Sequence, residues 1–275
     1  MAPVKSFHLH LVSDATGETI SSIVRACLVQ FENVAIEEHS WFLVRTPAQI
    51  QRILNAVEKD RGIVLFTLVN SSLREALEEG CGQLKIPCIP ALDPVMGALR
   101  SYFGVESKDQ PGRQHALDEE YYQRIDAMNF ALLHDDGQHV RDLNNADVVL
   151  VGVSRTSKTP TCVYLANRGI RAANVPIIPG SPLLDVVERT TQPLVVGLTM
   201  DPDRLVEARK LRLPQAGGVD GYADFEKVRE ETLAARRVFA EHGWPVIDVT
   251  RRSVEETASA ILQLYAEWRK PPSDA

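Results

Sequence analysis

The chain has 275 residues, 44% of them apolar and 24% charged, and a formal net charge of -7. This length suits one large globular domain or two modest ones. The acidic balance argues against a protein that coats nucleic acid, which needs a basic face. No apolar stretch approaches the ~20 residues that cross a bilayer, and no secretion signal opens the sequence, so we expect a cytoplasmic protein without a membrane partner.

The first hundred residues alternate short apolar runs with helical patterns. Strands are predicted at 7–13, 36–44, 63–69 and 86–92. Strands that alternate with helices predict parallel pairing in a layered α/β sheet. A polar stretch with Pro111 and Gly112 follows, so we expect an N-terminal α/β domain at 1–104, then a linker and a bridging helix at 105–145.

A second unit, expected at 146–270, begins with the strand 146–152. This strand is apolar throughout, as a sheet covered on both faces requires. Further strands are predicted at 172–178, 193–200 and 245–249, and helices at 158–168, 182–188, 202–211, 224–241 and after the cap Ser253. The predicted fold class is therefore α/β, with two α/β units built on mainly parallel sheets.

The stretch "VLVGVSRTSKTPTCVYLANRG" at 150–170 approaches the phosphate-binding pattern G-x-x-x-x-G-K-[ST]. In such a loop, backbone N–H groups surround a phosphate, the lysine reaches the outer phosphates and the next hydroxyl can ligate Mg²⁺. Ser157 stands where the pattern has its second glycine. The candidate phosphate-binding residues are Gly152, Val153, Ser154, Arg155, Thr156, Ser157, Lys158 and Thr159, with Thr159 also the candidate metal ligand.

A plain polar turn between strand and helix, capped by Ser154 or Thr156, would explain the same residues. The density of hydroxyl groups beside Arg155 and Lys158 favours an anion site over that alternative. Pro160 suits the first turn of the helix that follows, where its missing N–H has no cost.

Three carboxylates are candidates for holding a metal or accepting a proton. Asp135 and Asp136 precede the strand that carries the loop, and Asp201 follows the strand 193–200. Asp135 and Asp136 could equally be the solvated end of a helix, and Asp201 before Pro202 could be an ordinary helix cap. His8 and His10 alternate with apolar residues on the first strand, where buried, hydrogen-bonded histidines are the expected outcome; no histidine pairs with a cysteine at zinc-ligand spacing.

Four stretches together resemble the bacterial and plant regulatory proteins of pyruvate, phosphate dikinase, a superfamily that includes the regulators of phosphoenolpyruvate synthase. They are "LLHDDG" (132–137), "GVSRTSKTP" (152–160), "YLANRGIRAANVPIIP" (164–179) and "GLTMDPDRL" (197–205). The similarity extends from 7–19 to 247–258. It implies a P-loop kinase-like C-terminal domain and a bifunctional enzyme. One activity transfers phosphate from ADP to a threonine of the target, and the other removes it with inorganic phosphate, releasing pyrophosphate.

The resemblance also implies roles for individual residues. Lys158 would stabilise the transferring group, Thr159 would position Mg²⁺, and Asp136 or Asp201 would place the metal or accept the proton. Pyruvate, phosphate dikinase is the preferred target, with phosphoenolpyruvate synthase as the alternative, and a homodimer is compatible with either. Two other hypotheses stay open: an ATP-dependent kinase of small molecules, and a sensor that binds nucleotide or phosphate without turnover.

Overall fold

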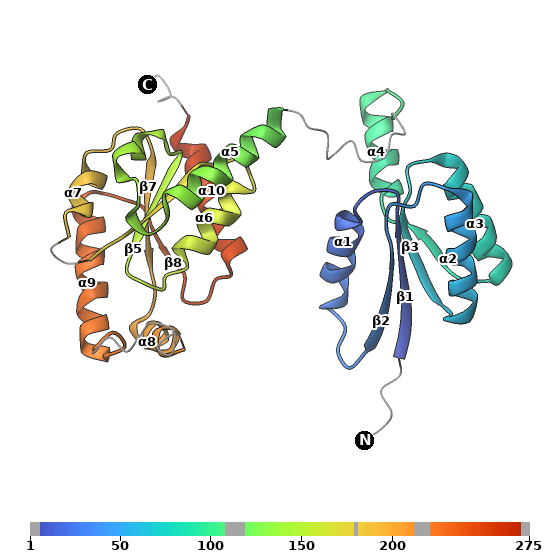
Figure 1. The fold of residues 1–275 in the computed structure, drawn as a ribbon, viewed down its shortest axis with the longest axis horizontal. Helices are drawn as coiled ribbons and strands as arrows, with labels where there is room; N and C mark the ends of the chain where they lie inside the picture. Colours follow the sequence, from blue (N-terminus) through green and yellow to red (C-terminus); the bar gives the residue numbers. More distant parts are fainter. Residues whose placement is uncertain (1–5, 108–118, 179–180, 212–220, 271–275) are drawn as a thin grey trace. The chain divides into compact units, whose positions relative to one another are not determined.

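The computed structural model describes residues 6–107, 119–178, 181–211 and 221–270. The chain divides into two compact units, Met1–Ala116 and Leu117–Ala275 (Figure 1). Residues 108–118, the centre of the expected linker, lie outside the described residues. The helix that follows them, α5 (Glu119–Leu133), belongs to the second unit, where Ala127 and Ala131 are buried in its core.

The first unit is a four-stranded parallel sheet in the order β2-β1-β3-β4. Its strands are β1 (Ser6–Ser13), β2 (Ala35–Trp41), β3 (Gly62–Thr67) and β4 (Cys88–Pro90). Its helices are α1 (Glu18–Leu28), α2 (Pro47–Lys59), α3 (Ser71–Leu84) and α4 (Asp93–Phe103). The expectation of parallel α/β pairing is confirmed.

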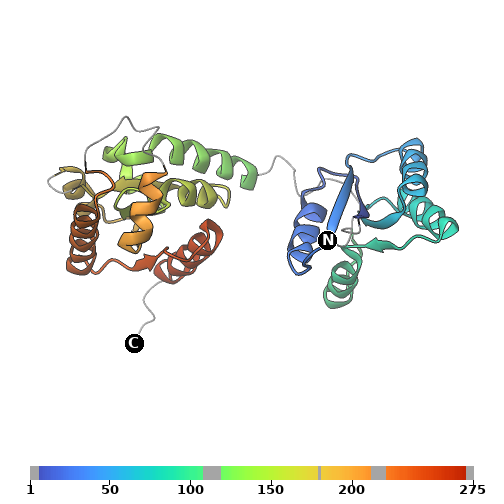
Figure 2. The same ribbon diagram turned by 90° about the horizontal axis from the view of Figure 1, so that it is seen from below.

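Residues of β1 face both sides of the sheet, so the first unit has two core clusters, one on each face. Leu9 and Leu11 pack against α1, whereas Val12 packs in the cluster of α2 and α3. Figures 1 and 2 show α1 on one side of the sheet and α2 with α3 on the other. Helix α2 begins at the predicted cap Thr46, where Gln49 completes a capping box.

Three elements of the first unit differ from the sequence prediction. Strand β4 spans Cys88–Pro90 rather than 86–92. Helix α4 contains Pro94 in its first turn and was not predicted. Its apolar residues do recur at helical spacing, at Val95, Met96, Leu99, Tyr102 and Phe103, but none of its residues is buried. Strand β2 ends at Trp41 rather than 44, because Leu43 adopts a left-handed backbone with φ 56°, which no strand accommodates.

The second unit repeats this topology, with a parallel sheet in the order β6-β5-β7-β8. Its strands are β5 (Val148–Gly152), β6 (Ala172–Pro176), β7 (Leu194–Thr199) and β8 (Val246–Asp248). Its α-helices are α5 (Glu119–Leu133), α6 (Lys158–Ala166), α7 (Leu183–Glu188), α8 (Pro202–Lys210), α9 (Phe225–Glu241) and α10 (Val254–Trp268), with short 3₁₀ turns η2 (Asp135–Gly137) and η3 (Val140–Asn145).

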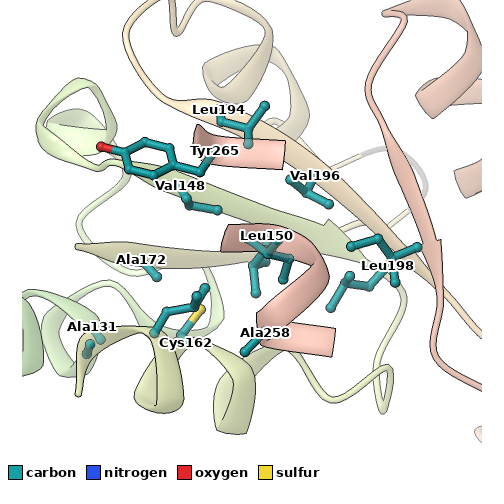
Figure 3. Packing of buried hydrophobic residues seen from close by; sticks show 14 of the residues in the cluster. Ala131, Val148, Leu150, Cys162, Ala172, Leu194, Val196, Leu198, Ala258 and Tyr265 are labelled. Atoms are coloured by element: carbon teal, nitrogen blue, oxygen red, sulfur yellow. The ribbon is translucent and has the colours of Figure 1, made fainter. Parts of the chain in front are cut away.

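Both faces of this second sheet are covered. Val148 and Leu150 of β5 pack with residues of α5, α6 and α10 on one face, a cluster shown in Figure 3. Val149 and Val151 pack with residues of α8 and α9 on the other. Every residue of β5 is buried, as its unbroken apolar sequence predicted. Within the described residues, no helix is long and apolar enough to cross a membrane.

Candidate functional site

The phosphate-loop candidate joins the central strand β5 to helix α6. In the order β6-β5-β7-β8, the connection that leaves β5 leads to β6 on one side of it, and the next connection leads to β7 on its other side. Open α/β sheets bind ligands at such a change of direction, beyond the carboxyl ends of the strands. Gly152 ends β5, and a Cβ atom there would lie 2.5 Å from the backbone oxygen of Leu198. Only glycine therefore fits at the first position of the loop pattern.

Ser157 occupies a position that glycine would fill more easily. Its backbone is left-handed, with φ 60° and ψ 22°, and it forms the N-cap of α6. This conformation costs a residue with a Cβ about 1–2 kcal/mol. The backbone oxygen of Ser157 accepts hydrogen bonds from the N–H (3.1 Å) and the hydroxyl (2.7 Å) of Thr161, which hold the turn in place. The serine thus keeps the loop conformation that the pattern expects of glycine.

Lys158 lies inside the loop rather than in solvent. Its side chain is buried, and Nζ donates a 2.9 Å hydrogen bond to the backbone oxygen of Val153. Burial lowers the pKa of Lys158 to about 8, although the negative charges of Asp136 and Asp135 oppose the shift. Among the described residues this carbonyl is the one hydrogen-bond partner of the buried ammonium group, which therefore favours an anion beside it.

Asp135 binds the loop from the preceding turn η2. Thr159 donates its hydroxyl to Asp135 Oδ1 at 2.9 Å, and the amide of Asn174 donates to Asp135 and, at 3.0 Å, to the Thr159 hydroxyl. Asn174 is 1% exposed, and among the described residues its Oδ1 has no hydrogen-bond partner. The three side chains place several oxygen atoms together at the start of α6.

Asn174 is not among the site residues that the sequence pattern predicts. It is the lone polar residue in the apolar stretch 172–178, and that break in the pattern was the available signal. The pairing of β6 with β5 sets Asn174 beside Leu150, two residues before the loop begins.

A cavity of about 1130 Å³ opens in front of these residues. Asp136, Lys158 and Thr159 line it together with Arg209 and Tyr222. Its volume slightly exceeds the ~300–1,000 Å³ of ordinary small-molecule pockets, so a nucleotide can enter. Among the described residues, the carboxylate of Asp136 has no hydrogen-bond partner, which leaves it free toward the cavity.

Arg209 is a second buried cation of this cavity, and sequence analysis missed it. Its side chain is 2% exposed, pairs with Glu231 at 2.6 Å and lies 4.8 Å from the ring centroid of Tyr222. The hydroxyl of Tyr222 in turn lies 2.9 Å from that of Ser154 on the loop. Helices α8 and α9 are thereby tied to the phosphate-loop candidate.

Asp201 does not line the cavity. It is exposed and forms the N-cap of α8, where its carboxylate accepts hydrogen bonds from the N–H groups of Asp203 (3.0 Å) and Arg204 (3.4 Å). Its own N–H donates to Thr250 at 2.9 Å. Helix capping accounts for both contacts of the carboxylate, and the structure places Asp135 and Asp136, not Asp201, at the loop.

The donor set at the start of α6 fits Mg²⁺. Thr159 and Asp135 offer hydroxyl and carboxylate oxygens, the hard ligands that this ion prefers, and the amide N–H₂ of Asn174 donates to both and holds them together.

Taken together, the parallel α/β fold and the buried lysine of this loop beside a nucleotide-sized cavity are features of an α/β protein that binds phosphate groups. A family model described as kinase/pyrophosphorylase matches residues 9–262. The chain belongs to the kinase/pyrophosphorylase family.

Close relatives carry a consistent name. A protein of Paramagnetospirillum magneticum named as a pyruvate, phosphate dikinase regulatory protein is 56% identical over 95% of this chain and 85% of its own length. Proteins with the same name from Rhodospirillum rubrum (52% identity, 94% and 95% coverage) and Bradyrhizobium diazoefficiens (50%, 98% and 98%) are similar to almost the whole chain.

Proposed function

We propose that this protein regulates pyruvate, phosphate dikinase in both directions. In one direction it moves the terminal phosphoryl group of ADP onto a threonine hydroxyl of the target, leaving AMP. In the other, inorganic phosphate removes that group from the phosphothreonine and pyrophosphate leaves. The names of the relatives support this target, and the observation that carries the chemistry is the buried Lys158 ammonium group within a loop beside Thr159 and Asp135.

In this proposal the loop binds the phosphates. The N–H groups at the start of α6 lack intrahelical acceptors and, with the helix dipole, favour an anion. Lys158 exchanges its contact with the Val153 carbonyl for a phosphate oxygen, which replaces a neutral partner with a charged one. The same group of donors serves ADP in one direction and inorganic phosphate in the other, because both directions place phosphate beside the threonine.

Asp136 is our candidate for the proton acceptor. It faces the cavity, and no described residue hydrogen-bonds its carboxylate, whereas Asp135 is engaged by Thr159 and Asn174. Asp135 and Thr159 would hold Mg²⁺, which would supply charge neutralisation at the phosphates, and Asn174 would orient both of them. This arrangement separates the metal-side carboxylate from the proton-accepting one. Cytoplasmic location and the expected homodimer remain parts of the proposal.

The test is transfer of label from ADP radiolabelled on its terminal phosphate. Pyruvate, phosphate dikinase and phosphoenolpyruvate synthase are offered separately in their phosphohistidine forms, and phosphothreonine is measured. Label on the dikinase supports the proposal, and label only on the synthase reassigns the target. Transfer of phosphate from ATP to a small metabolite, with neither protein labelled, would establish a small-molecule kinase instead. Saturable nucleotide binding without any turnover would establish a sensor.

A further inference from the structure

Three metal-ligating side chains of the first unit lie together on strands β1 and β2. The parallel register sets His8 beside Glu37 and His10 beside His39, so all four side chains share one face of this strand pair. One ligand atom each from His8, Glu37 and His39 lie within 4.8 Å of one another. None of these residues belongs to the unit that carries the phosphate loop.

The distances within this cluster suit a single metal ion. His8 Nδ1 lies 3.1 Å from His39 Nε2 and 3.7 Å from Glu37 Oε2. Two imidazole nitrogens bound to a tetrahedral zinc ion are about 3.3 Å apart, as its bond lengths of ~2.0–2.1 Å require. Two neutral imidazoles that direct lone pairs at each other over this distance repel unless a proton or a cation lies between them.

The neighbouring His10 is placed to orient His39. His10 is completely buried; its Nε2 lies 2.8 Å from the backbone oxygen of Asp60, and its Nδ1 accepts the indole N–H of Trp41 at 3.4 Å. Both ring nitrogens are therefore occupied, so His10 is not itself a ligand. Its ring stacks on that of His39, with centroids 4.5 Å apart and planes 13° apart, and such outer contacts fix the orientation of a ligating histidine.

We propose that His8, Glu37 and His39 bind one divalent transition-metal ion of the zinc class. Two imidazoles and a carboxylate are ligands that Zn²⁺ accepts, whereas Mg²⁺ prefers oxygen atoms alone. The side chains of His8 and Glu37 are 27% and 62% exposed, which leaves the ion an entry path and open coordination positions. Strand β2 is an edge strand, so the ion clamps it to β1 and stabilises the first unit.

The experiment is titration of the chelator-treated full-length protein with Zn²⁺ by calorimetry, with Mg²⁺ in excess so that oxygen-donor sites stay filled. Co²⁺ is added in a parallel titration, because its visible absorption reports tetrahedral nitrogen and oxygen coordination. The variants are His8→Gln, His39→Gln and Glu37→Gln. Glu38→Gln is the matched control, since its side chain points to the opposite face of β2. Asp135→Asn tests the alternative location beside the phosphate loop.

We expect one equivalent of Zn²⁺ per chain and a visible Co²⁺ band. Each ligand variant should weaken binding by at least about tenfold, the loss that even an outer-shell change can cause. Zn²⁺ should raise the melting temperature of the parent and of Glu38→Gln, but not of His39→Gln. Because Glu37 is exposed, Glu37→Gln tests the site without threatening the fold. Absence of binding, or binding lost in Asp135→Asn and retained in His39→Gln, would overturn the proposal.

Discussion

Thr159, at the start of α6, donates a 2.9 Å hydrogen bond to Asp135, 24 residues earlier in the chain. This bond joins the phosphate-loop candidate to the turn that ends α5, and Asn174 of β6 contacts both side chains. One residue of the loop pattern is thus held by two residues outside it. Five predictions follow from this arrangement and from the neighbouring contacts.

Lys158→Ala should lower the rate of transfer from ADP by about 100-fold or more, because it removes a buried positive charge from the site of developing negative charge. The measurement is phosphothreonine formed on the target from labelled ADP. Lys210→Ala, a change to an exposed lysine near the end of α8, is the matched control and should retain the parent rate. Equal rates of phosphothreonine formation for the two variants would show that Lys158 takes no part in the transfer.

Affinity for ADP should be constant below pH 8 and fall as the pH rises above it. The free protein has a Lys158 pKa lowered to about 8 by burial, and a bound anion favours the ammonium form, so binding above that pH requires uptake of a proton. The terminal phosphate, with a second pKa near about 6, does not change its charge in this range. Calorimetry from pH 7 to pH 9.5 measures the effect.

The same lysine should affect stability. Its folded-state pKa lies below the ordinary 10.5, so the unfolded chain binds more protons between about pH 8 and 10.5, and stability rises with pH across that window. Relative to Lys158→Met, the parent should gain up to about 3 kcal/mol of unfolding free energy between these limits. Denaturant unfolding at pH 7.5 and pH 10 measures the difference, and a constant difference contradicts the lowered pKa.

Substitutions of Ser157 should separate backbone strain from hydroxyl chemistry. Ser157→Gly should change the unfolding free energy by less than about 1 kcal/mol, since relief of the left-handed conformation is offset by greater freedom of the unfolded chain. It should also retain transfer activity. Ser157→Val should destabilise the protein by at least about 1 kcal/mol, because a β-branched side chain is strained at φ 60°. A severe loss of activity in Ser157→Gly alone would assign a role to the hydroxyl.

Asp135 and Asp201 should respond differently to substitution. Asp135→Asn should raise the Mg²⁺ concentration required for half-maximal transfer by at least about tenfold, because a charged oxygen donor is lost beside Thr159. Asp201→Asn should leave both transfer and stability near the parent values, since asparagine caps a helix as well as aspartate does. Asp201→Ala should cost about 1 kcal/mol of stability. A raised Mg²⁺ requirement for transfer in Asp201→Asn would show instead that Asp201 acts in the catalytic site.

Much of the fold follows from short-range patterns. The apolar run before Gly152 and the cap and proline at Thr46 and Pro47 predicted a buried strand and a helix start, and the structure has both. Helix α4 was not predicted although its apolar residues recur at helical spacing, and none of them is buried in the structure. The end of β2 was misplaced because nothing in its sequence marks the left-handed backbone of Leu43.

The sequence by itself determined the parallel α/β class and the position of the loop from Gly152 to Thr159. Periodicity, capping and turn chemistry act between residues close together in the chain, so a pattern can express them. Only the tertiary structure decided that Asn174 and Arg209 belong to the site, that Asp201 caps a helix, and that His8 meets His39. Those contacts depend on which strands are neighbours and in what register, and strand pairing joins residues whose separation along the chain carries no local signal.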